Sequence, residues 1–250
     1  MIYLAKMNNN EKIITQIQEN DFNLNLINDI IIELSQRPNP LHFEIIDLLL
    51  DTLSNEELSK ININIVYLLG ELGKIASLEQ KYIQYLYETF YVSDRWIRSE
   101  ILKVLEKNLD LVKSNSNFIQ ILSSALKEEY ESNIIIALKI IRQLDKFPAP
   151  LFKSILVVLN KTESKLNENI AKVIERHLND DFLIFELLNQ NDNYRILKPH
   201  GLRLILQAFF PSTNKIENFQ TLIENSDWED EEKSKFLKEI AIIRNLVNRI

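Results

Sequence analysis

Hydrophobic residues recur at helical spacing along almost the whole chain. Most segments place apolar residues at i, i+3, i+4 and i+7, the stripe that one face of an α-helix presents, and alternating strand-like stretches are nearly absent. Proline-containing links separate these segments, as in RPNP (37–40), KFPAP (146–150) and FPSTN (210–214). The sequence therefore predicts an all-α protein of short helices joined by short connections.

The helical pattern repeats every 31 to 36 residues. When Ile61 is taken as position 0 of a helix, positions 4, 5, 7 and 8 are apolar: Ile65, Val66, Leu68 and Leu69. The same positions are apolar or small when counting starts at Ile97, Asn133, Leu166 or Leu197, and a weaker copy starts at Ile27 and includes Ile31 and Ile32. Another apolar helix precedes each copy. The repeating unit is therefore a helical hairpin that occurs about six times.

Two stretches carry more specific residues. In VSDRWIRSEILKVLEKNL (92–109), Asp94 is followed by Ile97 and Arg98, and YLLGELG (67–73) ends in a Leu-Gly-x-Leu-Gly pattern. Both stretches resemble the HEAT-repeat family, in which an Asp in the turn precedes a Val or Ile and then an Arg. The resemblance covers about residues 22–205 and departs from the family at Asn133. It implies a right-handed α-α superhelix, a solenoid of stacked hairpins, and the related armadillo repeats remain an alternative.

The same resemblance suggests one helical-repeat domain over residues 1–250. We expect an N-terminal capping repeat at 1–36, central repeats at 37–210 and a C-terminal capping repeat at 211–250. In the last repeat, Ser226 and Glu229 have the spacing of a capping box, and the acidic stretch NSDWEDEE (225–232) stands where a helix N-terminus favours negative charge.

Small residues at core positions predict close helix packing. Gly70 and Gly73 lack side chains, so their helix end can approach a neighbouring helix, and Gly73 can supply a left-handed C-cap. Ala137, Ala171 and Gly201 stand at core positions of other copies, where we expect the same close packing.

Position 6 of each second helix points away from the predicted apolar face. This position and position 10, one turn later, hold a series of mostly basic residues: Tyr67, Lys103, Lys139, Lys172 and Arg203 at position 6, and Lys107 and Arg176 at position 10. The HEAT resemblance implies that second helices line a concave surface. Since packed helices lie about 10 Å apart, the predicted basic ladder would match an acidic or phosphorylated segment with a charge at every third residue. The alternative is a solvated face whose field Glu100, Glu106 and Glu175 offset.

A second candidate surface is the aromatic stretch YIQYLYETFYVSDRW (82–96). Ile83, Leu86 and Phe90 form one helical stripe and are predicted core residues. Tyr82, Tyr85, Tyr87 and Tyr91 fall partly outside that stripe. They either anchor a protein partner or fill space between first helices.

No catalytic or metal-binding pattern is found in the sequence. The chain has no cysteine, and its three histidines, His42, His177 and His200, lack the spacing of metal ligands. There is no glycine-rich phosphate loop. We therefore predict a non-enzymatic protein with no metal and no cofactor.

The leading hypothesis is a cytoplasmic scaffold or adaptor that binds an acidic or phosphorylated protein segment. The absence of cysteine fits a reducing compartment, and no segment reaches the length of a membrane span. One alternative is a nucleic-acid-binding module similar to the alkylated-base DNA glycosylases, which use HEAT-like stacks. The net charge of −7 disfavours it, and no catalytic Asp can be aligned. A further alternative is an assembly subunit that uses the aromatic first-helix face.

Overall fold

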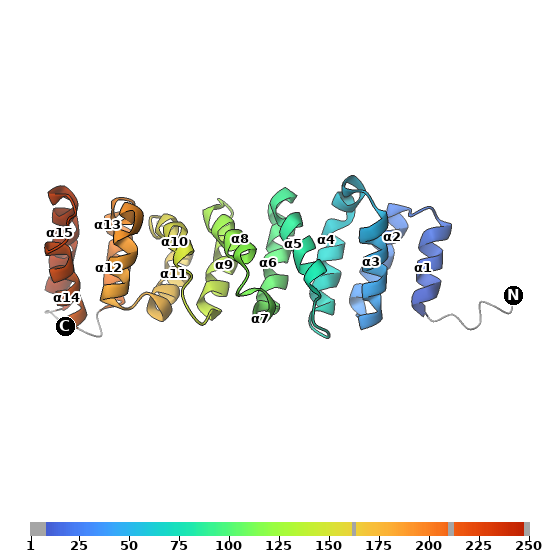
Figure 1. Ribbon diagram of the computed structural model, residues 1–250, viewed down its shortest axis with the longest axis horizontal. Helices are drawn as coiled ribbons and strands as arrows, with labels where there is room; N and C mark the ends of the chain where they lie inside the picture. Colours follow the sequence, from blue (N-terminus) through green and yellow to red (C-terminus); the bar gives the residue numbers. More distant parts are fainter. Residues whose placement is uncertain (1–8, 162–163, 210–212, 248–250) are drawn as a thin grey trace. The chain divides into compact units, whose positions relative to one another are not determined.

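Helices make up all of the regular structure in the part of the chain that the structure describes. The computed structural model describes residues 9–161, 164–209 and 213–247, and the prediction of an all-α protein is confirmed for them (Figure 1). The chain divides into two compact units, residues 1–114 and 115–250. The expected boundary between residues 210 and 211 lies outside the described residues.

Unit 1 consists of successive helix pairs. Its elements are α1 (Asn9–Glu19), α2 (Leu24–Gln36), η2 (Pro40–His42), α3 (Phe43–Thr52), α4 (Asn55–Leu72), α5 (Gln80–Val92), α6 (Arg95–Lys107) and the short α7 (Leu109–Val112). We call α1, α3 and α5 first helices, and α2, α4 and α6 second helices. The second helix α4 packs between α2 and α6, and the first helix α1 packs on α3 (Figure 1).

Unit 2 repeats this arrangement. Its elements are α8 (Ser116–Lys127), α9 (Glu131–Gln143), η3 (Ala149–Leu151), α10 (Phe152–Leu159), α11 (Ser164–His177), α12 (Asp181–Asn189), η4 (Gln190–Arg195), α13 (Pro199–Gln207), α14 (Thr213–Glu224) and α15 (Asp230–Val247). Here α8, α10, α12 and α14 are first helices. The second helices α9, α11, α13 and α15 pack one on the next in chain order.

Side-chain caps in the sequence set where several helices begin. Ser54 and Glu57 form a capping box at α4, in which the Ser54 backbone N–H donates to Glu57 Oε2 at 2.8 Å. At α6 the Asp94 carboxylate accepts hydrogen bonds from the N–H groups of Trp96 and Ile97 at 2.8 and 3.0 Å. The Asp that marked the HEAT resemblance is therefore a helix cap.

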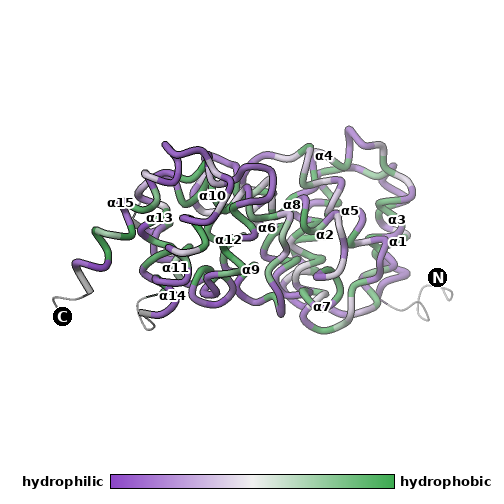
Figure 2. Tube along the Cα trace, turned by 60° about the vertical axis from the view of Figure 1, so that its left-hand side comes forward, coloured by the Kyte–Doolittle hydropathy of each residue, from purple (hydrophilic) through white to green (hydrophobic). Residues whose placement is uncertain are grey.

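The core is formed by the apolar stripes that the repeat predicts. Hydrophobic (green) and hydrophilic (purple) stretches interchange along the helices (Figure 2). The four residues predicted from Ile61 are fully buried, and those predicted from Ile97 and Asn133 are buried as well. Because each helix pair shares its stripe with the next pair, burial of apolar surface favours stacking within each unit.

Two predicted core residues are instead exposed. Ile32 of α2 is 47% exposed, and Ala171 of α11 is exposed. Both stand at position 5 of their copies, and each helix turns that position toward solvent. Close packing at Ala171 was therefore a wrong prediction, whereas Ala137 is buried as expected.

The glycines do allow close helix approach. A Cβ at Gly70 would lie 2.9 Å from Val104 Cγ2 of α6, and one at Gly73 would lie 2.9 Å from Asn108 Nδ2. A Cβ at Gly201 would lie 3.0 Å from the backbone oxygen of Leu159. The predicted left-handed cap at Gly73 is wrong, because its φ of −63° and ψ of −13° are right-handed helical values.

At the C-terminal end, the predicted capping box is also wrong. Helix α15 begins at Asp230, so Ser226 lies too far upstream, and its hydroxyl donates to the Ile223 carbonyl at 2.7 Å. The acidic first turn is confirmed, with Asp230, Glu231 and Glu232 at the helix start.

Trp228, which precedes this helix, belongs to a buried aromatic cluster. Its ring stacks on Tyr194 with centroids 4.3 Å apart and meets Phe236 edge-on at 5.0 Å. Its indole N–H donates to Asn189 Oδ1 at 3.0 Å. Trp228 therefore belongs to the core of unit 2, although the sequence around it is acidic.

Candidate functional site: the exposed face of the second helices

All residues of the predicted basic ladder lie on the solvent face of second helices. Each of them is exposed: Tyr67, Lys103, Lys107, Lys139, Lys172, Arg176 and Arg203. The prediction that position 6 faces away from the core is therefore confirmed within each unit. In unit 1 these residues come from α4 and α6, and in unit 2 they come from α9, α11 and α13.

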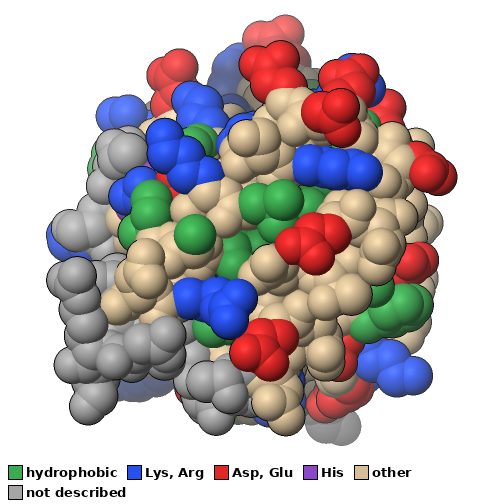
Figure 3. Space-filling model, turned by 90° about the vertical axis from the view of Figure 1, so that its left-hand side faces the viewer, with side chains coloured by type: hydrophobic (Ala, Val, Ile, Leu, Met, Phe, Trp, Pro, Cys, Tyr) green, Lys and Arg blue, Asp and Glu red, His purple; other side chains and the backbone are tan. Residues whose placement is uncertain are grey.

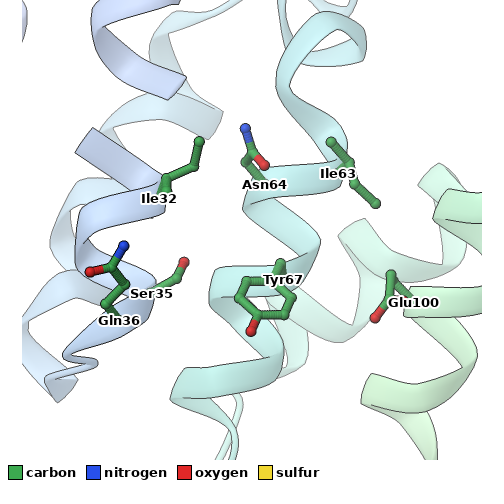
Figure 4. Close-up of a pocket in the computed structure, with 7 residues that line it drawn as sticks. All are labelled: Ile32, Ser35, Gln36, Ile63, Asn64, Tyr67 and Glu100. Atoms are coloured by element: carbon green, nitrogen blue, oxygen red, sulfur yellow. The ribbon is translucent and has the colours of Figure 1, made fainter. Parts of the chain in front are cut away.

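In unit 1, Tyr67 borders an open groove rather than a row of cations. The groove lies across α2, α4 and α6 and has a volume of about 510 Å³. Figure 4 shows Ile32 of α2, Ile63 and Tyr67 of α4, and Glu100 of α6 around it. Ile63 is 38% exposed and Tyr67 is 50% exposed. The second-helix face of unit 1 thus combines apolar and polar groups.

Three ladder cations form ion pairs with carboxylates of the same unit: Lys103, Lys172 and Arg203. Lys103 Nζ lies 2.6 Å from Glu100 Oε1, as the sequence anticipated. Lys172 Nζ lies 2.6 Å from Glu168 Oε1, and its hydrogen bond lowers the pKa of the Glu168 carboxyl. These pairs lie within single helices at exposed positions, where ion pairs contribute little to stability.

Arg203 forms a different kind of pair, between two helices. Its Nε and Nη2 donate to the carboxylate of Glu239 on α15 at 2.5 and 3.2 Å. Only 7% of the Glu239 side chain is exposed. The hydrogen bonds to Glu239 raise the pKa of the Arg203 guanidinium. Sequence spacing did not predict this partner, because Glu239 lies 36 residues from Arg203 along the chain.

The remaining ladder cations have no such partner. Among the described residues, no carboxylate lies within ion-pair distance of Lys107, Lys139 or Arg176. Lys139 and Arg176 stand on α9 and α11, which pack against each other. Unit 2 therefore presents available cations on neighbouring second helices.

Acidic residues interrupt the basic surface elsewhere. Seen from the side on which α14 and α15 lie, Lys and Arg side chains are interspersed with Asp and Glu, and small hydrophobic patches lie between them (Figure 3). The visible face therefore has no continuous field of one sign. Binding by cations would depend on local positions rather than on net charge.

The aromatic first-helix surface is smaller than the sequence suggested. Tyr82 and Tyr87 of α5 are buried, so neither can act as an exposed anchor. The Tyr82 hydroxyl donates to Asp47 Oδ1 at 2.8 Å, a link between α5 and α3. Tyr85 is half-buried, and Tyr91 alone of these four is exposed. Tyr82 and Tyr87 therefore fill space inside the unit and do not anchor a protein partner.

The histidines lie apart and make separate contacts. A ring nitrogen of His177 lies 3.0 Å from the Ile141 carbonyl, and His42 Nδ1 accepts from the Asn39 backbone N–H at 3.3 Å. Burial lowers the pKa of both rings. Within the described residues, His, Asp and Glu form no group of three that could hold a metal ion.

No described helix has the length and hydrophobicity needed to cross a membrane.

No protein-family model, curated protein or solved structure matches the chain. The HEAT-repeat resemblance accordingly rests on the residues named above and stays a prediction.

Proposed function

We propose that the protein is a non-enzymatic scaffold that binds an acidic or phosphorylated segment of another protein along the exposed face of its second helices. In this proposal the helix pairs continue as one right-handed, HEAT-like solenoid of a cytoplasmic adaptor. The carrying observation is the position of Lys139, Lys172 and Arg203 at equivalent exposed places on α9, α11 and α13, which pack side by side in unit 2.

The cations differ in what they can contribute. Lys139 and Arg176 have no competing carboxylate in the described structure, so a phosphate or carboxylate can reach them directly. Lys172 must first leave Glu168, but an exposed ion pair contributes little to stability and is readily exchanged. Arg203 holds Glu239 in place and supplies less binding than its position suggests.

In unit 1, Tyr67 and its groove lie on the exposed face of the second helices. Ile32, Ile63 and Tyr67 expose apolar surface, and Lys103 and Lys107 follow on the adjacent helix α6. A segment that carries apolar as well as acidic residues fits this composition, because tyrosine buries a large area at small entropic cost.

A labelled peptide tests the proposal. The probe is a fluorescein-tagged peptide of about 12 residues with phosphoserine at every third position, read by anisotropy. Lys139→Glu with Arg176→Glu should weaken binding at least about tenfold, since both cations become repulsive without breaking an internal ion pair. The control is Lys127→Glu with Lys153→Glu on the first helices α8 and α10, which changes net charge equally and should leave binding intact. Equal loss in both variants, or unaltered binding in the first, contradicts the proposal.

The same proteins test the nucleic-acid alternative. Cations that neutralise phosphates give DNA binding that weakens steeply as salt rises. Duplex DNA binding at low salt that exceeds phosphopeptide binding would favour a nucleic-acid module over the scaffold. The second alternative is an assembly subunit that uses the first-helix face, where Tyr91 is exposed. It predicts that Tyr91→Ala loses a partner while the lysine variants retain it.

A further inference from the structure

Unit 1 contains a second recess, away from the Tyr67 groove. It lies where the N-terminal ends of α4 and α6 meet the C-terminal end of α5, and its volume is about 600 Å³. Helix α5 ends at Val92, and α6 starts three residues later at Arg95 after the Asp94 cap. The sequence analysis placed Asp94 in a turn and did not predict a pocket at this position.

Carboxylates surround this pocket, and two of them face no cation. Glu56 pairs with Lys60 of the same helix at 2.9 Å, with both side chains exposed. Glu88 accepts only from the Gln84 amide at 2.7 Å, and Asp94 accepts from backbone N–H groups at the start of α6. No basic side chain lies within ion-pair distance of Glu88 or Asp94 in the described residues. The lining thus contains three carboxylates and no Lys or Arg, although Arg98 Nε donates to the backbone oxygen of Ser93 at 3.0 Å.

Two polar groups of the pocket lining, the Asn62 amide nitrogen and the Ser93 hydroxyl, have no hydrogen-bond partner among the described residues. Asn62 is 7% exposed, and its Oδ1 accepts from the Tyr85 hydroxyl at 2.6 Å, which directs Nδ2 away from that bond. No hydrogen bond from Nδ2 is found within the described residues. Ser93 is 9% exposed, and its hydroxyl also has no partner there. The Ser93 hydroxyl is enclosed by protein, so the Asn62 amide nitrogen is the open donor that a ligand in the recess can satisfy.

Apolar surface completes the recess. Val92 is 82% exposed at the mouth, Leu58 is buried beneath, and Ile97 is half-buried on α6. The lining therefore combines an apolar wall, three carboxylates and the open amide donor of Asn62.

We propose that this pocket binds an arginine side chain presented by a segment of a partner protein. The aliphatic stem lies along Val92 and Ile97. The guanidinium donates to the Glu88 carboxylate and displaces the exposed Lys60 from the Glu56 carboxylate. Asn62 Nδ2 donates to a carbonyl oxygen of the partner backbone. Arginine suits the site better than lysine, because its planar group offers five donors to several acceptors at once.

This inference is independent of the proposed function. The arginine pocket lies in unit 1 and attracts positive charge, whereas the phosphopeptide test addresses cations of unit 2. Each site has its own probe, so failure of one leaves the other standing.

The probe is the peptide acetyl-Gly-Ala-Arg-Ala-Gly-amide, and its matched control replaces Arg with citrulline, which has the same shape without charge. In titrations followed by backbone amide NMR shifts, the Arg peptide should move Val92, Ser93 and Asp94, and the citrulline peptide should not. Equal shifts from both peptides, or no shift at these residues, would overturn the proposal.

Charge-neutral variants locate the binding. Glu56→Gln with Glu88→Gln should weaken the Arg peptide at least about fivefold, since each loses a charge-assisted hydrogen bond. Glu19→Gln with Asp51→Asn removes two exposed charges elsewhere in unit 1 and should have no effect. Lys139→Glu with Arg176→Glu should also bind the Arg peptide normally. Equal weakening by both carboxylate pairs would show that net charge alone attracts the peptide, and would refute the pocket.

Discussion

Arg203 of α13 clamps the nearly buried carboxylate of Glu239 on α15 through two hydrogen bonds. This contact joins two second helices, so Arg203 serves the structure of unit 2 as well as its surface. Removing Arg203 leaves a carboxylate that is hidden from water without its counter-charge, which is costly. Removing both partners leaves no such charge.

Arg203→Ala should therefore lower the thermal unfolding midpoint of the protein by several degrees, and more than Lys172→Ala does. Replacing the pair together, with Arg203→Leu and Glu239→Leu, should restore much of the loss. Differential scanning calorimetry measures all three. A midpoint unchanged by Arg203→Ala would show that the clamp contributes nothing.

Two tyrosines of α5 give opposite predictions for the loss of one hydroxyl. The Tyr87 hydroxyl is buried without a hydrogen-bond partner in the described structure, so Tyr87→Phe should be neutral or stabilise by about 1 kcal/mol. The Tyr85 hydroxyl donates to Asn62, so Tyr85→Phe should destabilise by about 1 kcal/mol. Urea unfolding followed by circular dichroism tests the difference, which a reversed order would contradict.

Alkaline pH should destabilise unit 1 through the same residues. Burial raises the pKa of Tyr85 and of Tyr87 to about 12, above the value of about 10 for an unfolded chain. Between these values the unfolded chain loses protons that the folded protein keeps, so the free energy of unfolding falls as pH rises.

The measurement is urea unfolding from about pH 8 to about pH 12. Tyr87→Phe should reduce the alkaline fall, whereas Tyr91→Phe, at an exposed position, serves as the control and should not. If the free energy of unfolding falls equally in the Tyr87 variant and the wild-type protein, Tyr87 does not contribute to the alkaline loss of stability.

A side chain at Gly70 should destabilise unit 1 because Val104 lies against this position. A Cβ would lie 2.9 Å from Val104 Cγ2, so Gly70→Ala should destabilise by about 1–3 kcal/mol despite the better helix propensity of alanine. Adding Val104→Ala makes room for the methyl group, so the double variant should be more stable than the sum of the single effects predicts. Additive effects in urea unfolding would contradict this account.

The sequence predicted those features that depend on a single helix. The stripe that starts at Ile61 identified its core residues, and position 6 identified an exposed face, because both follow from helical geometry. Gly70 predicted close packing because a glycine near a helix end has no side chain to keep a neighbouring helix away. Such inferences need no knowledge of which helix lies opposite.

Features that depend on the neighbour escaped prediction. Tyr82 is buried because the first helix α3 packs against it, where its ring stacks on Phe43 with centroids 4.9 Å apart. The partner of Arg203 is set by the stacking of α13 on α15. Asn62 illustrates the same limit, since its unpaired amide gains meaning only once Tyr85 and the surrounding carboxylates are in place.

The central claim is that second-helix cations receive an acidic segment, and a map of the bound phosphopeptide tests it most directly. Backbone amide shifts recorded during titration should change around Lys139 on α9 and around Lys172 and Arg176 on α11. Shifts that instead gather on the first helices α8 and α10 would contradict the claim. So would shifts that disappear in the control variant Lys127→Glu with Lys153→Glu, which has the same net charge as Lys139→Glu with Arg176→Glu.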